Sequence, residues 1–382
     1  MATLDPYELM NSRLIRLSKA SLSNAELEAV QRPLTNEFLG MGQETRLFEE
    51  ELSAFFGRPV VCVVNGTAAL QLALQAIGIG PGDEVLVPSL TYVASFQAIS
   101  ATGATPIPCD IDPFTCTLSL EDLPKRLSNK TKAVMPVHYA GHVGFLDEIY
   151  EFSMHHHLRV VEDAAHAFGT KRHGLFVGSA GDIACFSFDG IKNITSGEGG
   201  CIVSDDAAVL QSIRDIRLLG VVNDTTSRYS GGRSWEFDVT NQGWRYHMSD
   251  IMASIGRTQL TRREELGNLR QKLAKLYLER LSGSERAKPI LTEVDTVVPH
   301  IFPVRILGMR DRNSLRSRLR EKGIETGVHY RPNHTLSFFS RHVRAPLPNT
   351  DSVYPQLLTL PLHPDLTESD IDYVCTTLLR EL

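Results

Sequence analysis

Short apolar runs alternate with helical segments between residues 60 and 204, and this alternation constrains the fold of the 382-residue chain more than any other feature. Strands that alternate with helices predict an α/β fold with a mostly parallel sheet covered on both faces. Ligands of such folds bind at the carboxyl ends of the strands, so we expect the chemistry there. The apolar spacing predicts helices at Ala68–Ile77, Tyr92–Thr102 and Leu146–His155. The predicted strands are Val60–Val64, Glu84–Pro88, Thr105–Pro108, Ala133–Val137, Arg159–Glu162, Ile183–Phe188 and Cys201–Ser204.

The remainder of the chain lacks this alternation. Val222–Thr240 is rich in Gly, Ser, Thr and Asp and predicts a long loop, although its Trp235 and Phe237 favour partial burial. Asp250–Leu281 predicts one long helix or two, because its two glycines disfavour an unbroken rod. In the last third of the chain, the residue pattern predicts a strand at His300–Ile306 and a helix at Asn313–Lys322. It also predicts a final helix opened by the capping pair Thr367 and Asp370.

The length allows one large domain and a smaller one. We expect a large domain over residues 15–262 and a small α+β domain over residues 263–382. Residues 1–14 are expected to pack on the small domain.

Charge and composition exclude several classes of protein. The formal net charge is -6 and the basic residues are scattered, which argues against binding to nucleic acid or to an anionic membrane. No apolar run reaches the ~18 residues that cross a bilayer, and the N-terminus does not resemble a signal peptide. The six cysteines form no CxxC pair, so we interpret them as buried thiols of a cytoplasmic protein. His155, His156 and His157 have no second cluster at ligand spacing, so no metal site is predicted.

The first candidate site follows the strand that ends near Val64, where Asn65-Gly66-Thr67 leads directly into a helix. The N-terminus of a helix offers free N–H groups and a positive dipole, which suit a phosphate. Gly66 lets an anion approach the backbone, and Thr67 adds a hydroxyl donor. Thr67 could instead be a simple helix cap.

The second candidate is the pair Glu162-Asp163, which ends a buried strand. Carboxylates beside a core need a partner. A pyridinium nitrogen would be such a partner for Asp163, because the carboxylate would keep the ring protonated and electron-poor. Alternatively, Asp163 caps the next element or pairs with an arginine.

The third candidate is Lys192, which follows an aromatic strand in a glycine-rich turn. Burial lowers the pKa of a lysine and makes it a usable amine nucleophile. Ser187 lies nearby and could donate to a phosphate. The alternative is that Lys192 extends to solvent. A nucleophilic lysine, a carboxylate for a ring nitrogen and a phosphate-binding helix start are together what pyridoxal 5'-phosphate (PLP) requires.

The chain resembles the DegT/DnrJ/EryC1/StrS family of PLP-dependent nucleotide-sugar aminotransferases. That resemblance implies the aspartate-aminotransferase type of fold (PLP fold type I) with a seven-stranded sheet. The motifs that carry it lie in order along nearly the whole chain. They are Asn65-Gly66-Thr67-Ala68-Ala69-Leu70, Gly80-Pro81-Gly82-Asp83-Glu84-Val85, Pro88-Ser89-Leu90-Thr91-Tyr92-Val93-Ala94, Glu162-Asp163-Ala164-Ala165-His166, Phe186-Ser187-Phe188 with Lys192-Asn193, Gly197-Glu198-Gly199-Gly200, Met248-Ser249-Asp250, His329-Tyr330 and Leu360-Pro361-Leu362-His363-Pro364.

The resemblance implies a role for each matching residue. Lys192 would form the Schiff base with PLP and then move the proton, and Asp163 would bind the pyridine nitrogen. The family's remaining cofactor contacts fall on the phosphate group, the ring face and the ring hydroxyl. They correspond here to Gly66, Thr67, Ala68 and Ser187 at the phosphate, Tyr92 against the face, and His166 near the hydroxyl.

One stretch departs from the family pattern. Arg245 stands where the family has an Asn that reaches the phosphate of the neighbouring subunit's cofactor, and His247 replaces the usual Arg. Arg245 could bind the partner's cofactor or a substrate diphosphate, or could pair with a local carboxylate. The resemblance therefore implies a homodimer with its active site at the interface.

The implied reaction passes an amino group from glutamate through pyridoxamine phosphate to a nucleotide-linked keto-6-deoxyhexose, with a 4-keto sugar on dTDP favoured. The candidates on the sugar side are His329, Tyr330 and Arg331. A 3-keto-sugar or cyclitol aminotransferase and a PLP-binding sensor without turnover remain alternatives. A sugar dehydratase is disfavoured, because its relatives replace the lysine with histidine. The pathway stays open between surface polysaccharides, such as lipopolysaccharide O-antigen, and antibiotics.

Overall fold

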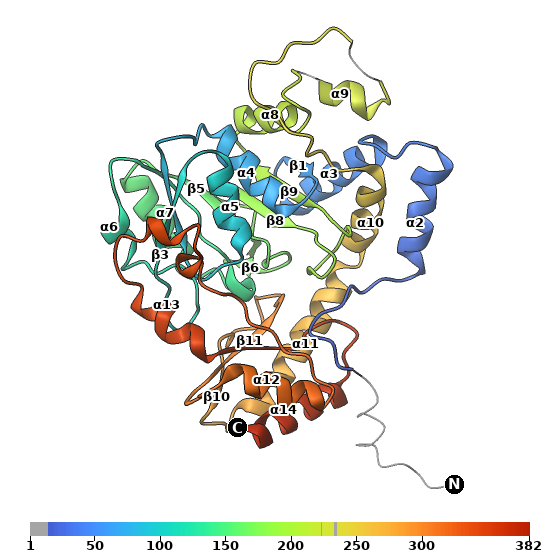
Figure 1. Ribbon diagram of the computed structural model, residues 1–382. Helices are drawn as coiled ribbons and strands as arrows, with labels where there is room; N and C mark the ends of the chain where they lie inside the picture. Colours follow the sequence, from blue (N-terminus) through green and yellow to red (C-terminus); the bar gives the residue numbers. More distant parts are fainter. Residues whose placement is uncertain (1–13, 223, 233–234) are drawn as a thin grey trace.

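A seven-stranded sheet forms the centre of the computed structural model, which describes residues 14–222, 224–232 and 235–382 (Figure 1). The strands lie in the order β1-β9-β8-β5-β4-β2-β3; β9 is antiparallel to both of its neighbours and every other pairing is parallel. The mostly parallel sheet is therefore as predicted. Its strands are β1 (Val60–Val63), β2 (Glu84–Pro88), β3 (Thr105–Cys109), β4 (Thr131–Val134), β5 (Arg159–Asp163), β8 (Ile183–Ser187) and β9 (Gly200–Ser204).

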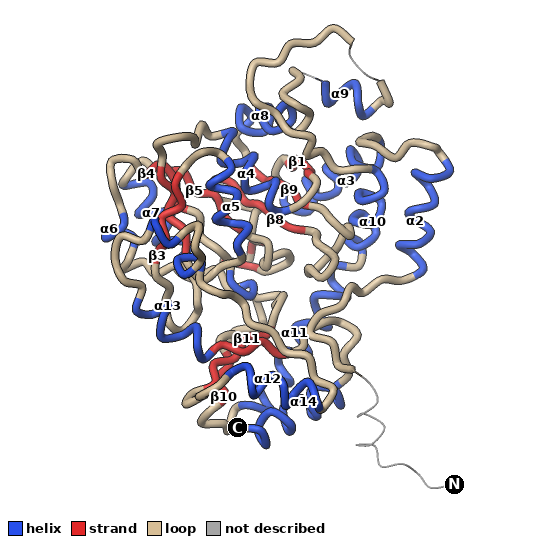
Figure 2. Tube along the Cα trace, in the orientation of Figure 1, coloured by secondary structure: helices blue, strands red, loops and turns tan. Residues whose placement is uncertain are grey.

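Helices cover both faces of the sheet, because the side chains of each strand alternate between two apolar layers (Figure 2). In β1, Val61 and Val63 contact the layer that includes α4, α5 and α8, whereas Val60 and Cys62 face α3 and α10. On that second face, α6 and α7 cover β2, β3 and β4. The helices of the two layers are α3 (Gln43–Phe56), α4 (Gly66–Ala76), α5 (Val93–Ala101), α6 (Leu123–Arg126), α7 (Leu146–His155), α8 (Ala207–Ile216) and α10 (Asp250–Thr261).

The last third of the chain forms an apolar cluster around a small antiparallel sheet, and buried residues from earlier in the chain, among them Leu90, Ile111 and Tyr139, belong to it. The N-terminal segment also joins it, since the N–H of Ile15 donates to Gly323 at 2.8 Å. The domain boundaries remain a prediction, and residues 1–13 of the predicted packing segment lie outside the described residues. The elements here are β10 (Ala287–Pro289), β11 (Phe302–Ile306), β12 (Leu357–Leu360), α11 (Arg263–Leu281), α12 (Arg312–Glu321), α13 (Pro348–Val353) and α14 (Glu368–Glu381).

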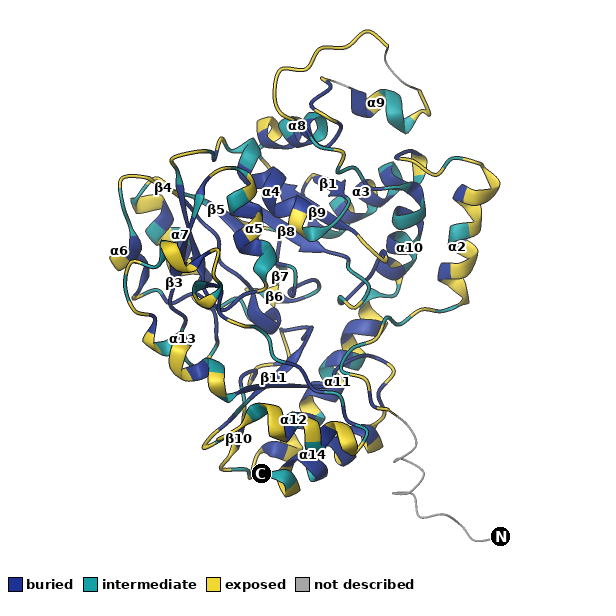
Figure 3. Cartoon of the chain, viewed as in Figure 1, coloured by how far each residue is buried: buried dark blue, intermediate teal, exposed yellow. Residues whose placement is uncertain are grey.

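The segment predicted as a long loop differs from expectation in two ways. It contains a short helix, α9 (Asp224–Tyr229), and its Trp235 and Phe237 are exposed rather than partly buried. Trp235 is 85% exposed and Phe237 is 59% exposed, and Figure 3 shows most of this loop in the colour of exposed residues. The loop is held at its base by the hydrogen bond from the N–H of Val222 to the Asp238 carbonyl.

Two further boundaries were refined by the structure. The fourth strand covers Thr131–Val134 rather than Ala133–Val137, because Pro136 has no N–H to continue the ladder. The long helical stretch is two helices that meet at Arg262, and neither glycine marks the break. The final helix opens with the predicted capping box, in which the N–H of Asp370 donates to Thr367 Oγ1 at 3.1 Å.

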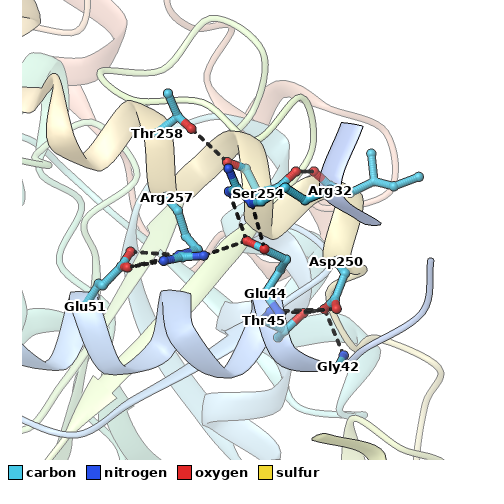
Figure 4. A network of polar contacts seen from close by, with 10 residues as sticks. Arg32, Gly42, Glu44, Thr45, Glu51, Asp250, Ser254, Arg257 and Thr258 are labelled. Atoms are coloured by element: carbon cyan, nitrogen blue, oxygen red, sulfur yellow. Dashed lines mark hydrogen bonds and ion pairs between the residues drawn. The ribbon is translucent and has the colours of Figure 1, made fainter. Parts of the chain in front are cut away.

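The Met-Ser-Asp motif connects α10 to the N-terminus of α3 (Figure 4). Asp250 Oδ1 accepts hydrogen bonds from the backbone N–H groups of Gly42 (2.8 Å) and Thr45 (3.0 Å). Gly42 has no side chain to cap α3, so Asp250 supplies the cap from another helix. Arg257 adds an ion pair to Glu44 at 2.7 Å. These contacts also border α2 (Asn24–Thr35), and they give the motif a structural role.

Candidate active site

A cavity of about 450 Å³ lies at the carboxyl ends of β1, β5 and β8. These three strands run in the same direction, so the residues that follow them meet at one edge of the sheet. Nine of the predicted site residues line this cavity, while Ala68, Arg245 and Arg331 do not. The nine are Gly66, Thr67, Tyr92, Asp163, His166, Ser187, Lys192, His329 and Tyr330.

One end of the cavity is formed by the first turn of α4. The cap of this helix is Asn65 rather than Thr67, since the Asn65 side chain accepts from the N–H of Ala68 at 2.8 Å. The Ala68 N–H is therefore already used, whereas Thr67 is exposed to the cavity. A Cβ at Gly66 would lie 2.8 Å from Ser187 Cβ, so only glycine lets the helix start this close to Ser187. This end of the cavity thus combines a helix N-terminus with two hydroxyl groups, which suits a phosphate.

The two carboxylates at the end of β5 have different partners. Asp163 lines the cavity and accepts a hydrogen bond from Ser95 Oγ at 2.7 Å. Glu162 turns away, and its oxygens lie 2.7 Å from His138 Nε2 and 2.6 Å from the Tyr150 hydroxyl. No arginine of the described segments lies at ion-pair distance from Asp163. Its carboxylate is therefore held in place and faces a space large enough for a cationic ring.

Lys192 extends into the cavity, which excludes the alternative of a side chain that reaches bulk solvent. Its Nζ lies 3.4 Å from His300 Nε2. Burial lowers the pKa of Lys192 to about 8, although the charges of Asp163 and Asp189 act in the opposite direction. The side chain is thus an amine with a much larger neutral fraction near neutral pH than an ordinary lysine has, as a nucleophile requires.

His166 and Tyr330 form a hydrogen-bonded pair on the wall of the cavity. The backbone N–H of Ala140 donates to His166 Nδ1 at 3.3 Å, so the proton of the neutral ring is on Nε2. Nε2 lies 3.0 Å from the Tyr330 hydroxyl and donates to it. Burial holds the pKa of His166 well below its usual range, so the ring stays neutral. Tyr92 lies at the mouth, 58% exposed, with its ring centroid 5.6 Å from that of Tyr330.

Two predicted residues lie outside the cavity. Arg331 is exposed and donates to Thr335 Oγ1 at 3.3 Å. Arg245 is exposed and is bridged through its backbone to Leu218, and within the described part of the chain its side chain has no carboxylate partner. The alternative of a local ion pair for Arg245 is therefore not observed. Lys192 is the one basic side chain among the lysines and arginines described that lines the cavity.

Sequence reasoning missed His300, Asp189 and Glu198, all of which line the cavity. Asp189 and Glu198 flank Lys192 in the sequence and could have been proposed from that proximity. Burial and the charge of Asp189 raise the pKa of Glu198 above its usual value. His300 comes from the last third of the chain, and the sequence around it contains no motif that indicates a site residue. Among the described residues there is no cluster that could hold a metal ion and no helix able to cross a membrane.

The donor set of the cavity fits PLP, because it offers a partly buried amine, a carboxylate for the ring nitrogen and a phosphate cradle closed by Gly66 and Ser187. Fold and site together define a PLP-dependent aminotransferase. Residues 20–379 match the model of the DegT/DnrJ/EryC1/StrS aminotransferase family, and the chain belongs to that family. The resemblance found in the sequence is thereby confirmed.

Solved structures agree with this assignment. The aminotransferase TlmJ from Streptoalloteichus hindustanus is 31% identical, with 96% of this chain and 98% of TlmJ covered and a TM-score of 0.88. The sugar aminotransferase CalS13 from Micromonospora echinospora is 30% identical, with 96% and 99% covered and a TM-score of 0.86. Spr1654 from Streptococcus pneumoniae, solved in a PLP-form, is 29% identical, with 97% and 100% covered and a TM-score of 0.88. The predicted fold type I and the predicted cofactor are both confirmed.

Proposed function

We propose that the enzyme transfers an amino group from L-glutamate to a nucleotide-linked 4-keto-6-deoxyhexose carried on dTDP. The observation that carries this proposal is the placement of Lys192 and Asp163 in one cavity at the carboxyl ends of the strands. The similarity to CalS13, which is a sugar aminotransferase, supports a sugar acceptor. The buried, free cysteines suit a reducing compartment, and they support a cytoplasmic location.

PLP supplies an electron sink that stabilises the carbanion formed when the donor loses a proton. The side chains of the cavity would hold the cofactor and move the proton. Lys192 would hold the cofactor covalently and would then move the proton, for which a pKa of about 8 is suitable. Asp163, held by Ser95, would pair with the ring nitrogen. Thr67, Ser187 and the start of α4 would hold the phosphate.

The other contacts follow from their positions in the cavity. Tyr92 would cover one face of the ring from the mouth. His166 would face the ring hydroxyl of the cofactor. The Nε2–H of His166 already donates to the Tyr330 hydroxyl. His329 and Tyr330 line the cavity and are our candidates for the sugar. Arg331 lies outside it, so a contact with the nucleotide portion is the role we propose for this residue.

We further propose that Arg245 acts in the active site of a second copy of the chain, on the cofactor phosphate or the substrate diphosphate. The exposed position of Arg245 and its lack of a carboxylate partner in the described structure support this proposal. The cavity also needs positive charge, since Asp163, Asp189 and Glu198 line it together with a single lysine. If Arg245→Ala changed neither the retention of PLP nor the affinity for substrate, this role would be wrong.

The substrate assignment is tested by turnover. Purified enzyme with PLP and glutamate would be offered 4-keto and 3-keto sugars on dTDP and on other nucleotides, and a cyclitol ketone. We expect 2-oxoglutarate and an amino sugar, with the highest kcat/KM for the dTDP-linked 4-keto sugar. A higher kcat/KM for a 3-keto sugar or a cyclitol would replace this assignment, and an absence of turnover with every acceptor would favour a sensor.

A further inference from the structure

His300 lies against Lys192 on the inner wall of the cavity. Its Nε2 is 3.4 Å from Lys192 Nζ, and no other polar atom of the described residues is recorded at hydrogen-bond distance from that amine. The His300 side chain is buried, at 4% exposure, and its ring centroid is 4.5 Å from that of His166. His300 is therefore the neighbour that the ε-amine meets whenever the amine is not attached to the cofactor.

The backbone around this pair is cross-linked by two buried side chains. Arg270, which is 2% exposed, donates from Nη1 to the His300 carbonyl at 3.1 Å and from Nη2 to the Ile191 carbonyl at 3.3 Å. Asn193 donates to the Val298 carbonyl at 3.0 Å. The residues on both sides of Lys192 are thus fixed to the segment that carries His300. Such a support holds the two side chains in one relative position.

The charges that face the pair leave His300 neutral. Burial, with the charges of Lys192, His166, Arg270 and His329, holds the pKa of His300 well below its usual range. Lys192 faces Asp163, Asp189 and Arg270. His166 does not compete for the contact, since its own N–H is donated to Tyr330. A neutral imidazole has one nitrogen that accepts and one that donates, so the tautomer of His300 decides how it meets the amine.

We propose that His300 is a positioning residue for Lys192, in which Nε2 accepts a hydrogen bond from the ε-amino group and leaves the nitrogen lone pair directed into the cavity. This inference rests on the role of Lys192 in the proposed function. In the opposite tautomer, His300 would donate to the lone pair and block it. The accepting tautomer places the proton on Nδ1, which is buried and has no hydrogen-bond partner among the described residues. That unpaired N–H is a cost, but the ammonium form of Lys192 has no lone pair and can only donate to Nε2.

The test uses the full-length apoenzyme, so that it does not depend on turnover. Trace acetic anhydride would acetylate the protein between pH 6 and 11, and mass spectrometry would quantify acetylation at Lys192. The rate follows the neutral amine, and for wild type its midpoint is expected near pH 8. In wild type, the Nε2 acceptor stabilises the ammonium form of Lys192 more than the neutral amine. His300→Leu removes this acceptor. The midpoint should therefore fall by about one pH unit.

Two variants serve as controls. His300→Gln retains an acceptor and should keep the midpoint close to that of wild type. His142→Leu changes a histidine that does not line the cavity, and it should leave the profile unchanged. An unchanged or raised midpoint in a folded His300→Leu protein would overturn the proposal. Failure to bind PLP would appear separately in the absorption spectrum, because the acetylation profile needs no cofactor.

A second measurement covers the case in which His300→Leu does not fold. The nitrogen chemical shifts of 15N-histidine-labelled wild-type apoenzyme report the tautomer of each ring, and comparison with His300→Gln assigns the signals of His300. A proton on Nδ1 is the expected result. A proton on Nε2 would show that His300 donates to Lys192, and the proposal would then be wrong.

Discussion

At the scale of the residue, the two adjacent carboxylates at the end of β5 allow a direct comparison. Asp163 faces the cavity, whereas Glu162 is bound to His138 and Tyr150. Asp163→Asn removes the charge that would pair with the ring nitrogen, and we expect kcat to fall about 10²–10³-fold while the fold is retained. Glu162→Gln should lower the melting temperature but have a much smaller effect on kcat. Equal losses of kcat in the two variants would contradict the assignment.

The pKa of Lys192 gives a second expectation at this scale. The neutral amine attacks PLP, so the rate of cofactor capture should rise with pH through about 8 and then level off. A lysine with its ordinary pKa would still be gaining rate near pH 10. Stopped-flow absorbance of apoenzyme mixed with PLP, recorded across this range, separates the two profiles. A rise that continues beyond pH 9.5 would show that the cavity does not lower the pKa of Lys192.

At the scale of the element, the start of α4 depends on the absence of a side chain at Gly66. Alanine usually stabilises a helix relative to glycine, but a Cβ here would lie 2.8 Å from Ser187 Cβ. We expect Gly66→Ala to cost about 1–3 kcal/mol of stability and to weaken PLP retention. Gly80→Ala is the matched control, since its nearest neighbouring atom would be 3.9 Å away. Thermal melts and equilibrium dialysis against PLP measure both effects.

The cap of α3 is a second prediction at this scale. Asp250→Ala leaves the N–H groups of Gly42 and Thr45 without an acceptor, and we expect it to lower the free energy of unfolding by about 1–3 kcal/mol. The exposed Glu264 is a suitable comparison, and its replacement by alanine should change stability by less than about 0.5 kcal/mol. Urea denaturation measures both. Equal stability of the two variants would remove the structural explanation of the Met-Ser-Asp motif.

The sequence predicted the sheet and the centre of the site for one physical reason. Asp163 and Ser187 are the last residues of apolar strands and Gly66 follows one, and strands of the same direction bring such residues to one edge. His300 could not be predicted in this way, because it reaches the cavity only through packing of the last third of the chain. Trp235 was misjudged because an aromatic side chain is buried only where another element covers it.

At the scale of the whole molecule, the proposed exchange of Arg245 between two copies can be tested by complementation. Lys192→Ala and Arg245→Ala chains would be unfolded, mixed in equal amounts and refolded. Each mixed dimer would hold one site with both residues intact, so the mixture should recover about a quarter of wild-type activity. If Arg245 acts on the cavity of its own chain, no mixed dimer has an intact site, and the activity of the mixture would not exceed that of the separate variants.

The central claim is that Lys192 is the residue that binds PLP covalently, and the visible absorption spectrum tests it most directly. Wild type and Lys192→Ala would each be incubated with PLP, scanned, and scanned again after glutamate. We predict a wild-type Schiff-base band near roughly 410–430 nm that bleaches with glutamate, and no such reactive band in Lys192→Ala. A wild type without the band, or a Lys192→Ala protein that shows the same band and the same bleaching, would contradict the account.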